Sequence, residues 1–364
     1  MTRSVLASAI RCTRRHFRHT GLKFLLIPAL LPLFACLPSC IDEDSYVDDP
    51  VGNFEALWRI MDEHYCFFSY KQINWDSVHS VYSHRIKPDM NGYALFDTLA
   101  AMLGELRDGH VNLYAPHDMG RYWSWYEDYP VNFYEELQRF YLGTDYRIAG
   151  NLKYKIILPD SVGYVHCPSF STGFGDGNID EVLYHFRKCK GLILDMRSNS
   201  GGQLTYAERL AEHFAPKRYL AGYIQHKTGT GHQDFSDPEP IYIDPSNGVR
   251  WLRPVVVLTN RRVYSAANWF VSCVRHLPHV VQVGDSTGGG SGLPFSSELP
   301  NGWKVRYSAS PMLDAGKNHI EWGIPPHLRV NIDLIYDYQR QGDNIIEAAR
   351  VLLESVLTGR SKLK

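Results

Sequence analysis

From residue 153 onward, short apolar runs alternate with helical patterns, and this alternation constrains the fold more than any other feature. The runs predicted to be strands are Lys155–Leu158, Gly163–Cys167, Gly191–Met196, Tyr219–Gln225, Pro254–Thr259, Val280–Gly284 and Lys304–Ser308. The segments with helical spacing of apolar residues are Asn178–Lys188, Leu204–Phe214, Ser265–Arg275 and Asn344–Leu357. Strands that alternate with helices predict an α/β layer with parallel strands, here over residues 153–358.

The region before this layer has a different pattern of apolar residues. Apolar residues recur at helical spacing in 53–69, 74–86 and 93–106, so residues 53–117 are predicted to be a small helical N-terminal subdomain. Residues 118–152 are rich in aromatic side chains and have no clear period. We interpret them as a connector whose stretch Tyr122–Tyr134 lines a cleft.

The first 39 residues carry an export pattern. They contain six basic residues and no acidic residue, and an apolar run extends from Phe24 to Leu37. This run is too short to span a bilayer comfortably and is broken by Pro28 and Pro32. The pattern predicts a secretory signal peptide over 1–39, and the acidic residues that follow predict a tether over 40–52.

The end of this signal indicates lipidation. Leu37-Pro38-Ser39-Cys40 resembles the lipobox of bacterial lipoproteins, in which the thiol is acylated, and the acids just after it resemble Bacteroidetes lipoproteins. Leu33–Cys36 is a competing lipobox, but the apolar run ends just before Cys40, and acidic residues follow Cys40 at once. The resemblance implies a protein of the cell envelope, anchored to the membrane by lipid on Cys40 and facing the periplasm or the cell surface.

Charge and cysteine spacing exclude several classes of protein. Beyond the signal, 32 basic residues stand against 39 acidic ones, so the body is acidic and a nucleic-acid partner is disfavoured. The remaining cysteines have neither CxxC nor paired spacing, which argues against a zinc site or a disulfide framework. We expect them to be small buried side chains: Cys66, Cys167, Cys189 and Cys273.

Three segments hold candidate catalytic groups. His110 lies in a polar segment after the last helix of the N-terminal region. Gly201 and Gly202 follow a buried strand and precede a helix, where backbone N–H groups suit an oxyanion hole. Ser265 also follows a buried strand, and its pattern fits either a helix cap or a nucleophile with the N–H of Ala266 beside it.

A fourth segment, Gly284–Gly292, is rich in glycine. It formally contains a G-x-S-x-G sequence around Ser286, but a nucleophile of that kind needs a helix straight after it, and a glycine run does not favour one. We therefore interpret the loop, with Gly288, Gly289 and Gly290, as a segment that lies beside a substrate backbone.

Together these segments resemble the S41 peptidase family, the C-terminal processing proteases and their tricorn-type relatives. The similarity covers about residues 53–330 and rests on five motifs in the family's order: Leu106–His110, Asp195–Gly202, Ser265–Ala267, Val283–Gly290 and Glu321–Pro326. The resemblance implies a ClpP/crotonase-like α/β core and a peptide or protein substrate. It implies no metal and no cofactor, and the sequence does not indicate an oligomeric state.

The chain departs from the processing proteases in its base. They use a Ser–Lys dyad, but Gly290 stands where their Lys would be, and no Lys lies between Ser265 and Lys304. The tricorn-type branch uses His, which His110 matches, and an acid, which Glu321 matches. That branch has Ser before the His, where this chain has Gly109.

The resemblance therefore implies a mechanism. Ser265 would attack the scissile carbonyl, His110 would act as general base, and Glu321 or Asp108 would orient the imidazole. The N–H groups of Ala266 and of Gly201 or Gly202 would bind the oxyanion, while Asp195 and Arg197 would brace the turn. Residues 114–153 are too few for the family's usual PDZ insert.

Two other functions remain open from the sequence. One is a lipid-anchored protein on the same scaffold that binds a peptide or ligand without catalysis. The other is an esterase that uses Ser286.

Overall fold

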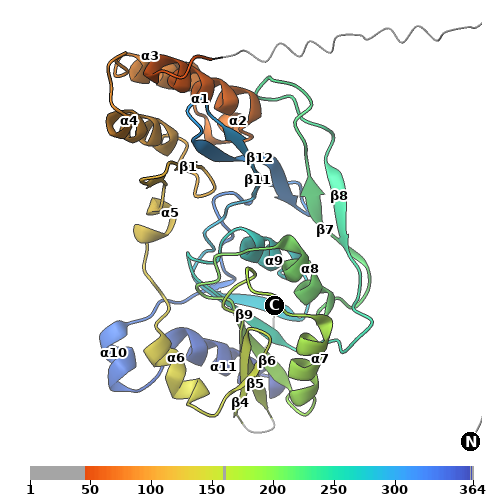
Figure 1. Cartoon of the computed structure of the whole chain (residues 1–364). Coiled ribbons are helices and arrows are strands. Elements are labelled where there is room, and N and C mark those ends of the chain that lie inside the picture. The colour runs from red at the N-terminus through yellow and green to blue at the C-terminus, as the bar shows by residue number, and fades with distance from the viewer. Residues whose placement is uncertain (1–45, 159–160, 361, 363–364) are drawn as a thin grey trace, which may run out of the picture. The chain divides into compact units, whose positions relative to one another are not determined.

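The computed structural model describes residues 46–158, 161–360 and 362 (Figure 1). The predicted signal peptide, Cys40 and the competing Cys36 lie outside the described residues. The chain divides into two units, residues 1–45 and 46–364, and every element discussed below belongs to the second. In the part of the chain that the structure describes, no helix is both long and apolar enough to cross a membrane.

A seven-stranded sheet forms the centre of the α/β layer. Its order is β13 (Leu328–Arg329), β10 (Val280–Gly284), β9 (Val255–Thr259), β6 (Gly191–Asp195), β5 (Val162–His166), β4 (Leu152–Leu158) and β3 (Arg147–Ala149). Neighbours from β13 to β5 are parallel, whereas β4 and β3 are antiparallel. The predicted α/β layer is confirmed for five of the seven predicted strands. The other two, Tyr219–Gln225 and Lys304–Ser308, belong to a second sheet with antiparallel pairing.

Helices cover both faces of this sheet because its central strands are apolar on both sides. On β6, Leu192 and Leu194 join the core that includes residues of α7 (Asp176–His185), α8 (Leu204–Glu212) and α9 (Ala266–Val274). The intervening Ile193 packs on the opposite face, with residues of α11 (Asn344–Leu357). Figure 1 shows α7 and α8 on one side of these strands and α11 on the other.

A second sheet packs against both the N-terminal helices and the core of the α/β layer. Its order is β2 (Met119–Gly120), β1 (Asn112–Tyr114), β12 (Lys304–Asp314), β7 (Tyr219–Ile224) and β8 (Glu239–Ile243), and β11 (Gly292–Glu298) also pairs with β12. β12 is long enough to pair with β1 near its start and with β7 near its end. It therefore connects both halves of the molecule.

The predicted N-terminal helices are confirmed as α1 (Pro50–His64), α2 (Phe68–Lys71), α3 (Trp75–Ser83) and α4 (Gly92–Gly104). Their core, however, is not made by residues 53–117 alone. It also buries Trp303, Val305 and Tyr307, which lie at or beside the start of β12. The helices have apolar faces that exceed what they can cover among themselves, and a distant strand completes the core.

The predicted tether over 40–52 is wrong at its end, because α1 begins at Pro50. Asp49 caps this helix: its carboxylate accepts a hydrogen bond from the Gly52 N–H at 2.7 Å. Proline is well suited to the first helical position, where no N–H is needed. The residues that suggested a break thus start a helix.

Other elements were not predicted. The connector 118–152 contains β2, α5 (Ser124–Glu127), α6 (Glu135–Leu142) and β3, and α10 (Leu334–Gln339) precedes α11. The strands β1, β8, β11 and β13 were also missed. These elements are short or partly exposed, so their sequences carry little periodicity.

A buried ion cluster braces the turn after β6, as predicted. Arg197 donates to both carboxylate oxygens of Asp195, at 2.9 and 2.7 Å, and to Asp343 at 2.8 Å. All three side chains are closed to solvent. Asp343 also caps α11 by accepting from the N–H groups of Ile345 and Ile346. The cluster therefore holds the turn that leads to Gly201 against a helix on the far face of the sheet.

Candidate active site

Ser265 lies at the turn between β9 and α9, in a backbone conformation that is rare for a residue with a side chain. Its φ is 55° and its ψ is −124°. Two hydrogen bonds hold this turn: the Ser265 N–H donates to the Gly289 carbonyl at 2.9 Å, and the Trp269 N–H donates to the Ser265 carbonyl at 3.0 Å. The Ser265 hydroxyl makes no capping hydrogen bond to α9, so it is available to another partner.

That partner is His110, which lies between α4 and β1. Its Nε2 is 3.0 Å from Ser265 Oγ, within hydrogen-bond distance. The His110 N–H donates to Asp108 Oδ1 at 2.8 Å, and the imidazole meets the ring of Tyr264 edge to face. The fold thus brings together two residues that are 155 positions apart and were predicted as a pair.

Burial sets the protonation state of His110. The side chain is buried, and this burial lowers the pKa of the imidazole to about 4, although the negative charge of Asp108 acts in the opposite direction. The positive charges of Arg306 and Lys71 lower the pKa further. The imidazole is therefore neutral at pH 7, the form that can accept a proton.

Glu321 and Asp108 do not orient His110 in the predicted way. Nδ1 of His110 makes no hydrogen bond to either carboxylate. The backbone of Gly292 is the hydrogen-bonding group that acts on the imidazole, and it raises the pKa. Glu321 instead pairs with Lys71, with 2.8 Å between Oε1 and Nζ, and accepts from the Ser291 N–H at 2.7 Å. Asp108 reaches His110 only through the backbone N–H. Neither carboxylate therefore contacts the imidazole as predicted. Asp108 contacts the loop that carries the imidazole, and Glu321 reaches the same loop through Lys71.

Lys71 was missed by the sequence analysis. Its ammonium donates to the carbonyls of Leu106 and Arg107, at 3.2 and 3.3 Å, and lies 3.5 Å from Asp108 Oδ2. Burial lowers the pKa of Lys71, but Asp108 and Glu321 raise it more, so the net direction is upward and the amine stays charged. Lys71 is therefore an anchor for the loop before His110 and not the base of a Ser–Lys dyad.

Gly109 has a steric reason to lack a side chain. A Cβ at this position would lie 2.9 Å from the Tyr264 hydroxyl and would also collide with the indole of Trp125. Trp125 stacks on Tyr264, with 4.0 Å between the ring centroids. An aromatic residue of the connector thus occupies the space that a serine before His110 would need.

Two backbone donors remain for an oxyanion. The Gly201 N–H donates to Asn199 Oδ1 at 2.9 Å. It is therefore not free to donate to an oxyanion, which corrects the prediction for Gly201. The N–H groups of Gly202 and Ala266 have no acceptor among the described residues, and both residues line the pocket beside Ser265. Gly201 contributes space instead, because its φ is +96° and a Cβ there would lie 2.9 Å from the Ala266 nitrogen.

The glycine loop mostly supports the turn at Ser265. Gly289 accepts from the Ser265 N–H, and the Gly290 N–H donates to the Glu321 carbonyl at 3.1 Å. A Cβ at Gly288 would collide with Trp125, and Cβ atoms at the next two glycines would collide with Glu321 and Tyr264. Only Gly290 of the three predicted loop glycines lines the pocket.

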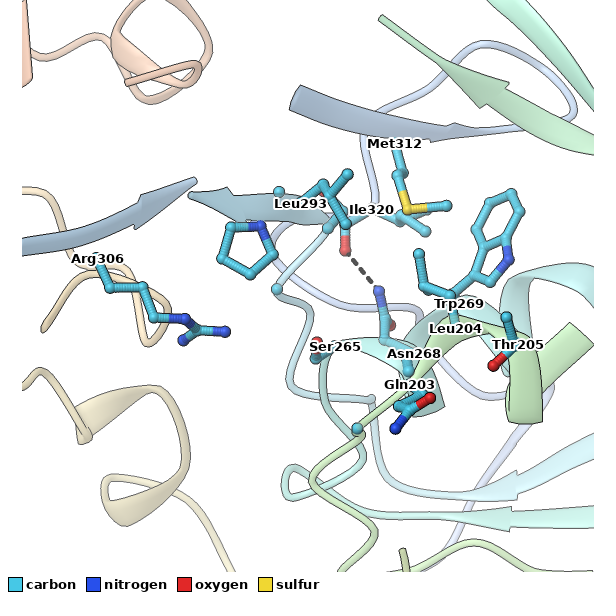
Figure 2. Close-up of a pocket in the computed structure, with 16 residues that line it drawn as sticks. Gln203, Leu204, Thr205, Ser265, Asn268, Trp269, Leu293, Arg306, Met312 and Ile320 are labelled. Carbon is cyan, nitrogen blue, oxygen red and sulfur yellow. Dashed lines mark hydrogen bonds between the residues drawn. The ribbon is translucent and has the colours of Figure 1, made fainter. Parts of the chain in front are cut away.

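A pocket of about 390 Å³ opens beside Ser265 (Figure 2). Figure 2 shows Leu204, Trp269, Met312 and Ile320 gathered on one side of the serine. The Asn268 side chain donates to the Ile320 carbonyl at 3.1 Å and ties the wall together. The predicted aromatic stretch Tyr122–Tyr134 contributes no lining residue to this pocket. Its Trp125 stacks on Tyr264 and its Phe133 stacks on His166.

Ser286 makes its hydrogen bonds in the described part of the chain to Asp285 and Arg329, not to a histidine. Its hydroxyl accepts from the Arg329 guanidinium at 2.9 Å, and its N–H donates to Asp285. No described contact therefore supplies this serine with a base. The four described cysteines are buried, as predicted.

Two family models match parts of this chain. The model of peptidase family S41 matches residues 161–330, and the model of the tricorn protease C1 domain matches residues 47–104. A crystal structure of a candidate peptidase from Parabacteroides merdae is 56% identical, covers 84% of this chain and 97% of that one, and superposes with a TM-score of 0.82.

More distant relatives extend the comparison. The carboxy-terminal processing protease CtpA of Bacillus subtilis is 24% identical over 181 residues, which are 49% of this chain and 37% of that protein. This chain thus matches little more than a third of the curated relative's length. The crystal structure of mature CPAF is 12% identical, covers 87% of this chain and 99% of that one, and has a TM-score of 0.64, which shows a shared fold.

Proposed function

The chain belongs to peptidase family S41, and on this premise we propose that it is a serine endopeptidase with Ser265 as nucleophile and His110 as general base. The observation that carries the assignment is the 3.0 Å contact between Ser265 Oγ and His110 Nε2. The hydroxyl that makes this contact sits on a strained turn and is not used to cap α9.

The proposed reaction begins with proton transfer. Neutral His110 accepts the hydroxyl proton through Nε2 while Ser265 Oγ bonds to the scissile carbonyl carbon. The imidazolium then gives this proton to the departing amine, and an acyl-enzyme remains. Water attacks the acyl-enzyme in the second half of the cycle, with His110 again as base, and restores the free serine. Asp108, next to the backbone of His110, stabilises the transient positive charge.

The carbonyl oxygen becomes negative in each tetrahedral intermediate. We assign its stabilisation to the Gly202 and Ala266 N–H groups, which have no other acceptor among the described residues. One such donor is commonly worth about 3 kcal/mol of transition-state stabilisation. The apolar side of the pocket, with Trp269 and Met312, would hold the side chain of the residue before the cleaved bond.

A fluorophosphonate probe tests the proposal directly, because it phosphonylates a serine only when the hydroxyl is activated. The probe should label the folded protein at Ser265, as read by peptide mass spectrometry, and Ser265→Ala should abolish labelling and peptide hydrolysis. Labelling at Ser286 would favour the esterase alternative. A folded protein that resists the probe and cleaves no peptide would favour the alternative of a non-catalytic binding protein.

We also propose that the protein is a lipoprotein of the cell envelope, anchored through Cys40. This proposal rests on the lipobox-like sequence and on the basic, apolar signal before it.

A further inference from the structure

Arg306 lines the pocket and has no ion-pair partner among the described residues. It lines the same pocket as Ser265, yet its guanidinium forms no hydrogen bond and no ion pair with any described residue. Figure 2 shows it reaching toward Ser265 from the side opposite Trp269 and Met312. The pocket thus has an apolar side and a cationic side, with the serine between them.

The fold keeps this charge from being neutralised internally. Arg306 lies on β12, where the residues directly opposite it on the two neighbouring strands are neutral, Asn112 on β1 and Ser296 on β11. The buried carboxylates of the site already have partners. Asp108 accepts hydrogen bonds from Ser308 and Tyr65, and Glu321 pairs with Lys71. A guanidinium in this position is a ready partner for a carboxylate from outside.

The strand register also tells which side of the substrate Arg306 faces. Its partner Asn112 follows His110 by two residues, so Arg306 lies on the His110 side of the serine. Its positive charge lowers the pKa of His110, in line with this proximity. A general acid must reach the nitrogen of the leaving amine, so the His110 side is the side of the leaving group.

We propose that Arg306 forms a subsite for a carboxylate in the leaving-group part of the substrate. The inference rests on the proposed function, because it defines the leaving group by the roles of Ser265 and His110. Two chemical sources would satisfy it: an acidic side chain after the cleaved bond, or the terminal carboxylate of a short leaving peptide. Both present two oxygens to a planar fork of donors.

The test uses the purified protein. A peptide mixture first identifies a bond that the protein cleaves, and internally quenched peptides are then made that share the sequence before this bond. The three leaving groups differ only in charge: neutral and amidated, acidic and amidated, or neutral with a free terminal carboxylate. Wild-type kcat/KM should be at least tenfold higher for one of the two carboxylates than for the neutral peptide. The acidic side chain or the free terminus is identified by which peptide is preferred.

Arg306→Gln should reduce this preference at least tenfold, and Arg306→Lys should retain part of it. Lys304→Gln is the matched control, since Lys304 lies on the same strand and does not line the pocket; it should keep the full preference. Equal rates for all three peptides, or a preference that survives in Arg306→Gln, would overturn the subsite. Probe labelling of the wild-type protein separates the two possible failures. If Ser265 is labelled, such a result overturns only the subsite; if Ser265 is not labelled either, the proposed function fails as well.

Discussion

Lys71 and Glu321 form an ion pair closed to solvent, with 2.8 Å between Nζ and Oε1 and with side chains that are 0% and 3% exposed. The same ammonium binds two carbonyls in the loop before His110. Glu321 in turn accepts from Ser291 beside the glycine loop. One buried pair therefore connects the segment that carries the proposed base with the segment that supports the proposed nucleophile.

Lys71→Met should destabilise the fold and misplace His110. Removing one partner of a buried ion pair typically costs about 3–5 kcal/mol, because the remaining charge is left without compensation. We expect a lower urea midpoint and at least a tenfold lower kcat in the folded variant. The measurements are urea unfolding and peptide hydrolysis.

Two further variants test the reason for that loss. Lys71→Met with Glu321→Gln removes both charges and should be more stable than Lys71→Met alone. Lys71→Arg keeps the charge and should recover part of kcat. If Lys71→Met unfolds at the wild-type urea concentration with wild-type kcat, Lys71 is not an anchor of the loop.

The acid limb of activity should lie near pH 4. Because burial lowers the pKa of His110 to about 4, the free enzyme keeps a neutral base down to about pH 5. We expect kcat/KM to be flat from pH 7 to about pH 5 and half-maximal near pH 4. An acid limb centred near 6.5, the ordinary histidine value, would contradict a desolvated imidazole.

The same shift also affects stability, so folding must be followed in parallel. The unfolded chain protonates His110 near pH 6.5, whereas the folded chain does so only near pH 4. Below pH 6.5 the unfolded state binds more protons, and stability falls as the pH drops toward 4. Circular dichroism at each pH separates unfolding from protonation of the base.

His110→Ala should lose about 10³-fold or more in kcat, as removal of a general base from a catalytic group of this kind does. Lys304→Ala and Lys317→Ala should each leave turnover largely intact, because neither residue contacts the site in the structure. The variants are compared in one peptide assay with thermal unfolding as the folding control. Wild-type turnover in His110→Ala with loss in either lysine variant would mean that a lysine is the base.

Gly201→Ala should reduce activity at least 100-fold. The φ of +96° disfavours a side chain, and the new Cβ would press on the Tyr264 carbonyl and the Ala266 nitrogen, at 2.7 and 2.9 Å. Displacement of the Ala266 N–H would remove a proposed oxyanion donor. Gly302→Ala is the matched control, since its φ is +80° but nothing lies within 4 Å of its Cβ.

The control should lose about 1–2 kcal/mol of stability from left-handed strain alone and retain full activity. Both variants are measured by thermal unfolding and by kcat. An active Gly201→Ala would remove the Ala266 N–H from the proposed oxyanion hole.

Cys40→Ala should release the protein from membrane fractions or block its processing, because the thiol is the proposed attachment point for lipid. The measurement is membrane fractionation with metabolic labelling by a fatty acid. Cys36→Ala serves as the control and should leave anchoring unchanged. A lipid-labelled, normally processed Cys40→Ala protein would assign the anchor to Cys36.

The sequence alone determined the α/β layer and the local setting of Ser265, His110 and the glycines. These features are encoded in short segments: an apolar run that ends in a small residue, or glycines at a turn, has few alternative conformations. Only the tertiary structure decided which groups meet. Lys71 is buried against Glu321 and Asp108 by a core that β12 completes from residues more than 200 positions away. The single N–H of Gly201 is taken by Asn199, and Arg306 has no ion-pair partner among the described residues. The register of neighbouring strands and turns sets these distances, and no local sequence pattern encodes that register.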